Sequence, residues 1–183
     1  MQIAESVAAA LEARVPLDRE RTVLDFGAGT GLLCGHVAPR VARVVAVDIS
    51  EAMLERLAAK PIMRGRVEIC CRNLLEQPLD ERFDLIVSTM TMHHVEDTVA
   101  VARTFHDHLV PGGRIAIADL DREDGSFHES GTPGVFHRGF DRDALGALFE
   151  AAGFADVTFS TACEVERNGG RYPIFLLTAS RPT

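Results

Sequence analysis

Residues 23–31 read Val-Leu-Asp-Phe-Gly-Ala-Gly-Thr-Gly, and this stretch decides the fold of the 183-residue chain. An apolar run that carries one acidic residue, Asp25, leads into the alternating glycines Gly27, Gly29 and Gly31, and a helical pattern follows at once. Glycine accepts positive φ and has no Cβ, so the backbone can turn sharply here and a ligand can approach closely. A strand that ends in such a turn and leads into a helix is typical of a nucleotide pocket.

The spacing of the glycines limits which class of ligand the turn can bind. A dinucleotide fingerprint would place its third glycine where this chain has Leu32. No phosphate-loop lysine follows the turn, and the neighbouring Asp25 would repel phosphates and favour a cationic ligand. Asp48 ends the next predicted strand, where a carboxylate can accept both hydroxyls of a ribose. The pattern therefore predicts a nucleoside ligand that carries positive charge.

Strand-like and helix-like segments alternate after the glycine turn, which predicts a parallel sheet with helices on both faces. We predict strands at 22–26, 43–47, 66–70, 83–88 and 114–118, and helices at 32–37, after the predicted N-cap Ser50, at 98–109 and at 141–152. Two β-rich runs, 155–165 and 171–179, flank Asn168-Gly169-Gly170 and predict an antiparallel hairpin. The expected fold is a Rossmann-like, doubly wound α/β domain over 1–183, with a mostly parallel seven-stranded sheet.

Two segments lie outside this alternation. Residues 1–16 predict a helix that either packs at the sheet edge or forms a lid over the ligand. Residues 119–140 are polar, and irregular stretches of this length are usually functional loops or lids. We expect a lid anchored by three phenylalanines, Phe127, Phe136 and Phe140, whose histidines contact substrate.

At this point the chain resembles the class I S-adenosylmethionine-dependent methyltransferases. The resemblance is carried by LDFGAGTG (24–31), VVAVDIS (44–50), CRNLLEQPLDERFDLIVSTMTMHHV (71–95) and LVPGGRIAIADL (109–120). It covers roughly residues 22–120, and the motifs occur in the family's order at normal spacing. The resemblance implies S-adenosylmethionine as cofactor and S-adenosylhomocysteine as product.

The family pattern implies a role for each matching position. Around the methionine portion of the cofactor it places Gly27, Ala28 and Gly29, with Asp25 holding the turn and favouring the ammonium, and Thr89 near the sulfonium. Around the nucleoside it places Asp48 on the ribose, Ile49 and Met53 against adenine and ribose, Asn73 as acceptor for the adenine amino group, and the Leu74 backbone N–H on the ring. Asn73 departs from the family, which usually has Asp here, and an amide oxygen accepts without charge.

Candidates for acid–base chemistry are histidines. A base is needed only if the methyl acceptor loses a proton as it attacks. Because adjacent residues do not share one face of a helical turn, at most one of His93 and His94 should line the pocket, and we favour His94. His128 and His137 are further candidates for contact with substrate. With two carboxylates they could also ligate a metal, but no metal-binding spacing supports this and we assign none.

Composition limits the partners. The net charge of −8 and the absence of a basic-aromatic stripe argue against nucleic acid. No charge-free apolar run of the length of a membrane span is present, and the four cysteines show no CxxC or metal-finger spacing and fit a reducing cytoplasm. We therefore expect a cytoplasmic enzyme, monomeric or homodimeric, that methylates a small molecule. The alternatives are an oxidoreductase that binds an NAD-type nucleotide and a catalytically inactive scaffold that binds S-adenosylmethionine.

Overall fold

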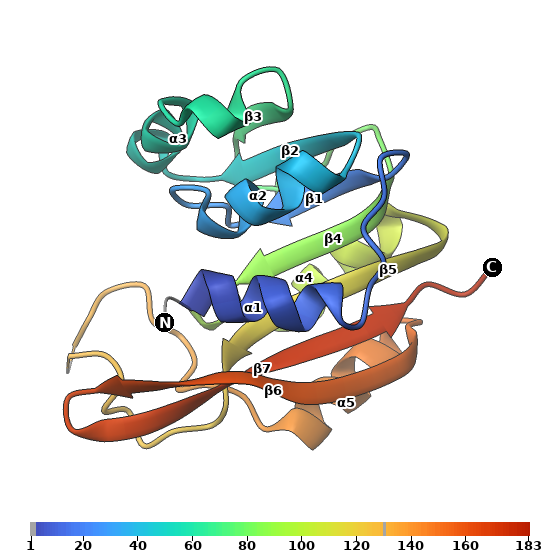
Figure 1. The fold of residues 1–183 in the computed structure, drawn as a ribbon. Helices are drawn as coiled ribbons and strands as arrows, with labels where there is room; N and C mark the ends of the chain where they lie inside the picture. The colour runs from blue at the N-terminus through green and yellow to red at the C-terminus, as the bar shows by residue number, and fades with distance from the viewer. Residues whose placement is uncertain (1–2, 130) are drawn as a thin grey trace.

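A computed structural model describes residues 3–129 and 131–183. Its strands form one seven-stranded sheet in the order β3-β2-β1-β4-β5-β7-β6 (Figure 1). The strands are β1 (Thr22–Phe26), β2 (Arg43–Asp48), β3 (Val67–Cys71), β4 (Phe83–Thr89), β5 (Leu109–Leu120), β6 (Ala155–Arg167) and β7 (Gly170–Ser180). The helices are α1 (Ile3–Glu12), α2 (Leu32–Val37), α3 (Glu51–Ala58), α4 (Thr98–Asp107) and α5 (Arg142–Ala151), with short 3₁₀ turns η1 (Ala38–Arg40), η2 (Pro61–Met63) and η3 (Met92–His94).

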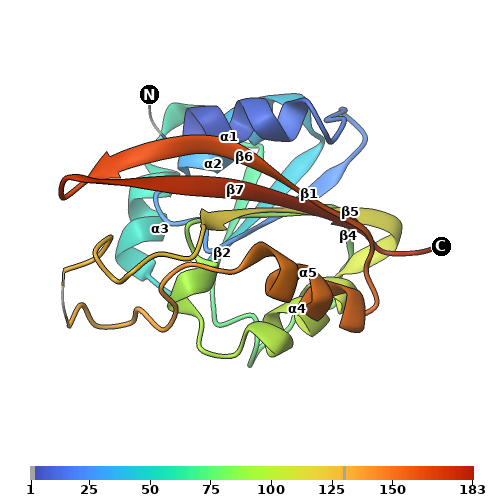
Figure 2. The ribbon, with the colours of Figure 1, turned by 90° about the horizontal axis from the view of Figure 1, so that it is seen from below.

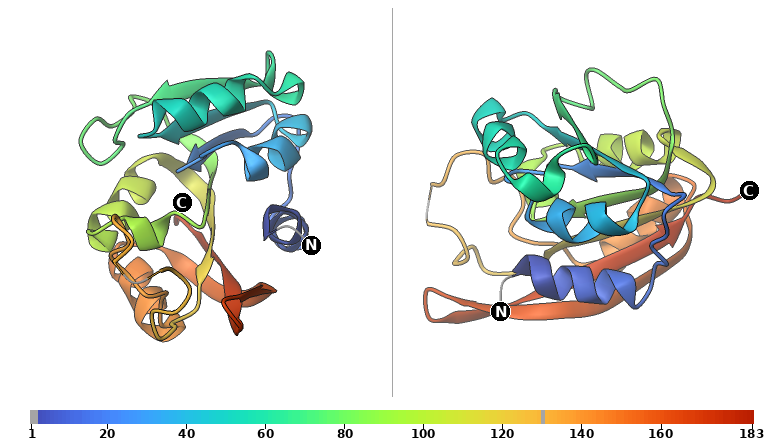
Figure 3. Two further views of the ribbon diagram at one scale, coloured as in Figure 1. Left: turned by 90° about the vertical axis from the view of Figure 1, so that its left-hand side faces the viewer. Right: turned by 45° about the horizontal axis from the view of Figure 1, so that its top comes forward.

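Helices cover both faces of the sheet. Helices α1 and α2 lie on one face, and α4 and α5 on the other (Figures 2 and 3). Each face has its own hydrophobic cluster: Val7 of α1 and Leu33 of α2 belong to one, and Phe105 of α4 and Phe149 of α5 to the other. The central strands are buried on both sides, which explains their nearly continuous apolar sequences. The predicted doubly wound α/β fold is confirmed.

The sheet changes direction at its last two strands. Strands β3, β2, β1, β4 and β5 pair in parallel, whereas β7 runs antiparallel between β5 and β6. Asn168 and Gly169 join β6 to β7, and both have positive φ, +50° and +77°. A two-residue hairpin turn that matches strand twist requires this conformation at both positions. The predicted hairpin is therefore present, with Gly170 already the first residue of β7.

Strand β5 differs from the prediction because it begins at Leu109 rather than at 114. The Pro-Gly-Gly segment at 111–113 consists of residues that favour a turn locally. Instead, the Gly112 N–H donates to the Arg181 carbonyl and the Arg181 N–H donates to the Gly113 carbonyl, at 2.9 and 2.8 Å. Backbone pairing with a residue far along the chain thus extends the strand through residues that locally favour a turn.

The N-terminal helix packs against the rest of the domain. Helix α1 contacts α2 and β6, with Val7 and Leu11 buried. Its first described residues, Ile3 and Ala4, also line the main cavity. The helix therefore combines packing against the sheet with a place at the cavity edge. No described helix is both long enough and apolar enough to span a membrane.

Residues 121–140, here called the return loop, connect β5 to α5. Phe127 and Phe140 are buried, but Phe136 is 53% exposed, so only two of the three expected phenylalanine anchors are in the core. The N–H groups of Phe136 and His137 donate to the carbonyl of His93, at 3.0 and 3.2 Å. The return loop is thus attached directly to the segment that follows β4.

Candidate functional site

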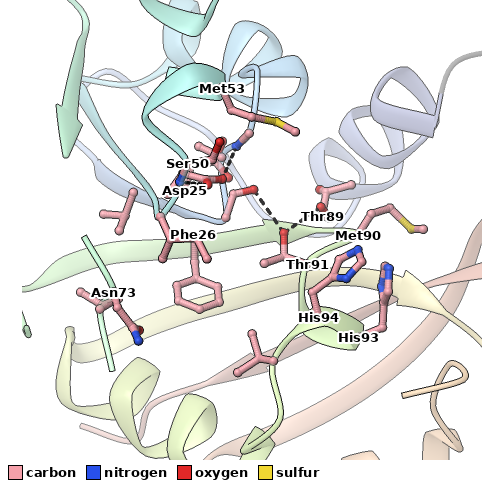
Figure 4. A pocket seen from close by; sticks show the side chains of 18 of the residues that line it. Asp25, Phe26, Ser50, Met53, Asn73, Thr89, Met90, Thr91, His93 and His94 are labelled. Carbon is pink, nitrogen blue, oxygen red and sulfur yellow. Dashed lines mark hydrogen bonds between the residues drawn. The ribbon is translucent and has the colours of Figure 1, made fainter. Parts of the chain in front are cut away.

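A cavity of about 950 Å³ opens at the carboxyl ends of β1, β2 and β4 (Figure 4). The chain runs outward from β1 to β3 and then returns to β4 on the other side of β1. Ligands of open α/β sheets bind where strand order reverses in this way. Asn73 lies at one end of the cavity in Figure 4, and His93 and His94 lie at the other.

The glycine turn forms the floor of this cavity. The N–H groups of Gly27 and Ala28 donate to the Val47 carbonyl, at 2.9 and 3.0 Å, which ties the turn to β2. Gly27 has φ +68°, and a Cβ added there would lie 2.1 Å from Thr91 Cγ2. Thr91 Oγ1 in turn donates to the Gly27 carbonyl at 3.2 Å. The turn and the loop after β4 therefore pack together without space for a side chain.

Asp48 connects the glycine turn to the start of α3. Its Oδ2 accepts from the Gly29 N–H at 2.7 Å, and its Oδ1 accepts from the Ser50 N–H at 2.9 Å. Each carboxylate oxygen keeps a further lone pair for a ligand hydroxyl. Ile49 and Met53 beside it expose apolar side chains at the cavity, Ile49 to 76%. An apolar surface next to the hydrogen-bonded Asp48 carboxylate suits a nucleoside.

Asn73 is engaged in its own turn. Its Oδ1 accepts from the Leu75 N–H at 3.1 Å, and its Nδ2 donates to Glu76 Oε1 at 2.9 Å. The amide oxygen has two lone pairs, so one stays free for a donor such as an adenine amino group. Leu74 is buried and lines the cavity. These two hydrogen bonds hold the Asn73 amide in one orientation.

Asp25 is a buried acidic residue at the cavity, and its pKa is strongly shifted. The carboxyl is almost wholly buried, and its Oδ2 has no hydrogen-bond partner among the described residues. Burial, and secondly the charge of Asp48, raise the pKa of Asp25 to about 7. Thr89 Oγ1 likewise has no partner within the described part of the chain. Buried polar groups are normally satisfied, so these two atoms indicate where donor and acceptor groups of a ligand belong.

Three histidines gather at the other end of the cavity. His93, His94 and His128 all line it, and their ring centroids lie 4.1 to 5.6 Å apart. The prediction that at most one of His93 and His94 would line the pocket is therefore wrong. The two residues belong to the 3₁₀ turn η3, and their ring centroids lie only 4.1 Å apart, so the two rings lie side by side at the cavity.

Two of these rings are held by oxygen acceptors. His93 Nδ1 lies 2.6 Å from Asp119 Oδ1, with both side chains buried, and His94 Nδ1 lies 2.7 Å from the Gly134 carbonyl. A carbonyl cannot donate, so His94 donates through Nδ1 and, when neutral, keeps a lone pair on Nε2. A carboxylate partner favours the same tautomer for His93. Burial, and then the neighbouring His93 and His94, lower the pKa of His128, which favours its neutral form.

Most of the site residues predicted from the sequence line this one cavity. All ten residues predicted to bind the cofactor line the cavity: Asp25, Gly27, Ala28, Gly29, Asp48, Ile49, Met53, Asn73, Leu74 and Thr89. His94 and His128 line it too, whereas His137 does not. His137 Nε2 lies 2.9 Å from the Val95 carbonyl and its ring stacks near Phe140, so it helps to fix the return loop.

Three features of the site were not predicted from the sequence: Thr91, Asp119 as the partner of His93, and Arg167, which lines the cavity from β6. Strands β4 and β5 pair with Thr89 opposite Ala118, so the residues following them are neighbours. The predicted parallel order of these strands could have indicated the His93–Asp119 contact. Arg167 offers no such signal, because its place depends on how far the terminal hairpin extends.

Comparisons with known proteins also indicate a methyltransferase. A family model described as "Methyltransferase domain" matches residues 2–158. An uncharacterised methyltransferase of Schizosaccharomyces pombe is 30% identical over 152 residues, which are 74% of this chain and 54% of that protein. A malonyl-[acyl-carrier protein] O-methyltransferase of Halorhodospira halophila is 31% identical over 144 residues, 74% of this chain and 49% of that protein. The chain thus spans about half the length of these curated relatives.

Solved structures share the fold. Haemonchus contortus phosphoethanolamine N-methyltransferase 2, in complex with phosphomonomethylethanolamine and S-adenosylhomocysteine, has a TM-score of 0.80 at 17% identity, covering 98% of this chain and 53% of that one. The YcgJ protein of Bacillus subtilis has a TM-score of 0.75 at 17% identity, covering 98% and 99%. With its matching family model, fold and cavity, this chain belongs to the class I S-adenosylmethionine-dependent methyltransferase family.

The cofactor of that family, S-adenosylmethionine, suits the residues present. Asp25 Oδ2, which has no hydrogen-bond partner among the described residues, matches its ammonium, and the Asp48 carboxylate matches its ribose hydroxyls. The cavity, at about 950 Å³, lies in the range of small-molecule sites.

Proposed function

We propose that this chain methylates a small molecule that binds at the histidine end of the cavity. The observation that carries the proposal is that one continuous cavity joins the glycine turn and Asp48 to His93, His94 and His128. A cofactor held at the first end leaves the second end for an acceptor. The S-adenosylmethionine bound there would supply a methyl group already activated on a sulfonium.

In this proposal, residues at the end of the cavity that contains the glycine turn and Asp48 position the cofactor. Asp25 would pair with its ammonium, Asp48 would accept from its ribose, and Asn73 would accept from its adenine amino group. Ile49 and Met53 would cover its rings with apolar surface. Because the donor is activated, holding the two reactants in line can account for much of the rate.

Residues of the second end would receive the acceptor. His94 is exposed, lines the cavity and keeps Nε2 free of its bond to Gly134, so it is placed to accept a proton from the acceptor. His128 shares this end of the cavity and would contact the acceptor from the return loop. The name of one relative, phosphoethanolamine N-methyltransferase, supports a small acceptor, and that of another, malonyl-[acyl-carrier protein] O-methyltransferase, names a small acyl group carried on a protein. The net charge of −8 does not favour nucleic acid as the acceptor.

The pKa of Asp25 predicts pH-dependent cofactor binding. The raised pKa, about 7, means that the free protein keeps a proton on this carboxyl that a bound ammonium would displace. Affinity for S-adenosylhomocysteine should therefore rise from pH 6 to pH 8 by about tenfold, as the ionised fraction grows, with proton release on binding. Calorimetric titrations in buffers of different ionisation enthalpy measure both effects. Asp25→Asn should flatten the profile, and an unchanged profile in that variant would remove Asp25 from the ammonium site.

Replacing His94 separates chemistry from cofactor binding. His94→Ala should lower turnover by about 10²–10⁴-fold, the usual contribution of a positioned acid or base. It should leave affinity for S-adenosylhomocysteine unchanged, because His94 stands at the acceptor end. His36→Ala, outside the cavity, is the matched control and should keep full turnover. Full turnover in His94→Ala would show that His94 is structural.

The proposal is tested by transfer of labelled methyl from S-adenosylmethionine to pools of phenols, amines, thiols and carboxylic acids, with protein and transfer RNA as parallel acceptors. Label is expected in a small-molecule pool. Label found only in protein or RNA would contradict the proposed acceptor class. Tight binding of NAD, with no binding of S-adenosylhomocysteine, would favour the oxidoreductase instead.

A further inference from the structure

We propose that His93, His94 and His128 bind a divalent transition metal ion, with zinc as the best match, at the acceptor end of the cavity. Among the described residues these three offer one ligand atom each, all within 4.8 Å of one another. Imidazole nitrogens suit zinc, copper, iron and nickel. The metal site rests on the geometry of this cluster alone, whereas the acceptor discussed with it below also rests on the proposed function.

The distances are close to those of a formed site. Tetrahedral zinc with bonds of 2.0–2.1 Å separates its nitrogens by about 3.4 Å. The three ligand atoms must therefore approach by at most about 1.4 Å, the difference between 4.8 and 3.4 Å. His94 is exposed and His128 half-buried, whereas His93 is buried. We expect small movements of the His94 and His128 side chains to close the difference.

The surroundings of His93 and His94 are those of metal ligands. Histidines that bind metals almost always donate their other ring N–H to a carboxylate or a carbonyl, which sets the tautomer and orients the ring. His93 has the buried Asp119 carboxylate at Nδ1, and His94 has the Gly134 carbonyl at Nδ1. Both arrangements leave Nε2 as the ligand atom. Asp119 is itself held, because its Oδ1 also accepts from the Leu120 N–H at 2.7 Å.

His128 completes the set from the return loop. Its Nε2 is buried and has no hydrogen-bond partner within 3–129 and 131–183. A tight turn presents it: Glu123 Oε2 accepts from the N–H groups of Gly125 and Phe127, at 2.7 and 3.1 Å. Phe127 is buried against Tyr172, with ring centroids 5.1 Å apart. A buried nitrogen without a partner is costly unless something binds it, and a metal ion would satisfy it.

Three protein ligands leave one position open, as in catalytic zinc sites. Because all three histidines line the cavity, an acceptor there could reach that position. Arg167 lines the same cavity, with its guanidinium 4.9 Å from the centre of the Phe127 ring, and adds a second positive charge. We therefore expect an acceptor with an oxygen nucleophile and anionic character. With the ion bound, His94 Nε2 is a metal ligand and does not accept the proton of the acceptor; a hydroxyl bound to the metal would instead lose its proton to water at a lower pH than in solution.

The metal is tested directly with the full, tag-free chain after treatment with a chelator. Titration with Co²⁺ should give visible absorption bands that saturate at one ion per chain, and Zn²⁺ should displace them. His94→Ala and His128→Ala should each weaken Co²⁺ binding at least about 100-fold. His36→Ala, the control, should bind as the wild type does. Absence of saturable binding, or unchanged binding in His128→Ala, would overturn the proposal.

A second variant tests the support behind the ligands. Asp119→Asn removes the charge next to His93 and should weaken Co²⁺ binding by about 10–100-fold. Equal binding in this variant and the wild type would contradict the assigned role of Asp119, and circular dichroism confirms that the variant is folded. Calorimetry with S-adenosylhomocysteine on the same samples separates the two proposals. Cobalt binding without nucleoside binding would defeat only the proposed function, and the reverse would defeat only the metal site.

Discussion

Gly27→Ala should abolish measurable binding of S-adenosylhomocysteine and lower the melting temperature of the protein. An added Cβ would lie 2.1, 2.3 and 2.7 Å from Cγ2, Oγ1 and Cβ of Thr91, distances at which the structure must shift. The positive φ of +68° adds roughly 1–2 kcal/mol of strain for a residue other than glycine. Because the turn is the floor of the cavity in which we propose that the cofactor binds, we expect a loss of affinity of at least about 100-fold, or about 2.7 kcal/mol. Isothermal titration calorimetry measures the affinity.

Gly65→Ala is the matched control for this substitution. Gly65 has nearly the same φ, +70°, but a Cβ there would meet no atom within 4 Å, and the residue does not line the cavity. It should show the strain of positive φ as a small loss of stability and bind S-adenosylhomocysteine as the wild type does. If Gly65→Ala lost affinity as strongly as Gly27→Ala, backbone strain rather than close packing against Thr91 would be the cause.

Asp48→Ala is the substitution with the second largest expected effect on the binding of S-adenosylhomocysteine. The carboxylate accepts from the Gly29 and Ser50 N–H groups and, in our proposal, also from the ribose. Hydrogen bonds to a charged group contribute about 1.5–3 kcal/mol each. Losing the ribose contacts and loosening the turn should weaken S-adenosylhomocysteine binding by one to a few kcal/mol, or about 10- to 1,000-fold. Calorimetry again gives the affinity.

Glu51→Ala controls for the loss of a nearby negative charge. Glu51 is exposed in the first turn of α3, three residues from Asp48, and does not line the cavity. Its removal should change affinity by less than about threefold, since exposed charges interact weakly. Unchanged affinity in Asp48→Ala would reject the ribose assignment. Equal losses in both variants would attribute the effect to net charge.

Much of the fold follows from local sequence. The glycine turn, the β-branched strands and the Asn168-Gly169 hairpin are dictated by backbone conformation and by apolar pattern, which act within a few residues. The start of β5 does not follow in this way. Pro111, Gly112 and Gly113 favour a turn locally, and only their pairing with Arg181 makes them part of a strand. Such long-range backbone bonds leave no trace in a local pattern.

The residues of the site also divide into those that local sequence predicts and those that depend on long-range contacts. The cofactor end is built on strand ends and the turns after them, so its residues could be placed from motif spacing. The histidine end depends on tertiary packing. Helical geometry predicted only one of His93 and His94 at the cavity and favoured His94, yet His93, held by Asp119, lines it too. His137 does not line the cavity, and its Nε2 lies 2.9 Å from the Val95 carbonyl, a contact that local sequence does not predict.

A crystal structure of the chain with bound S-adenosylhomocysteine tests the central claim most directly, that one cavity presents a methyl group to the histidine end. We expect the ribose hydroxyls within hydrogen-bond distance of Asp48, and the sulfur directed past Thr89 toward His94 and His128. A nucleoside bound away from Asp48, or a sulfur pointing away from the histidines, would contradict the account.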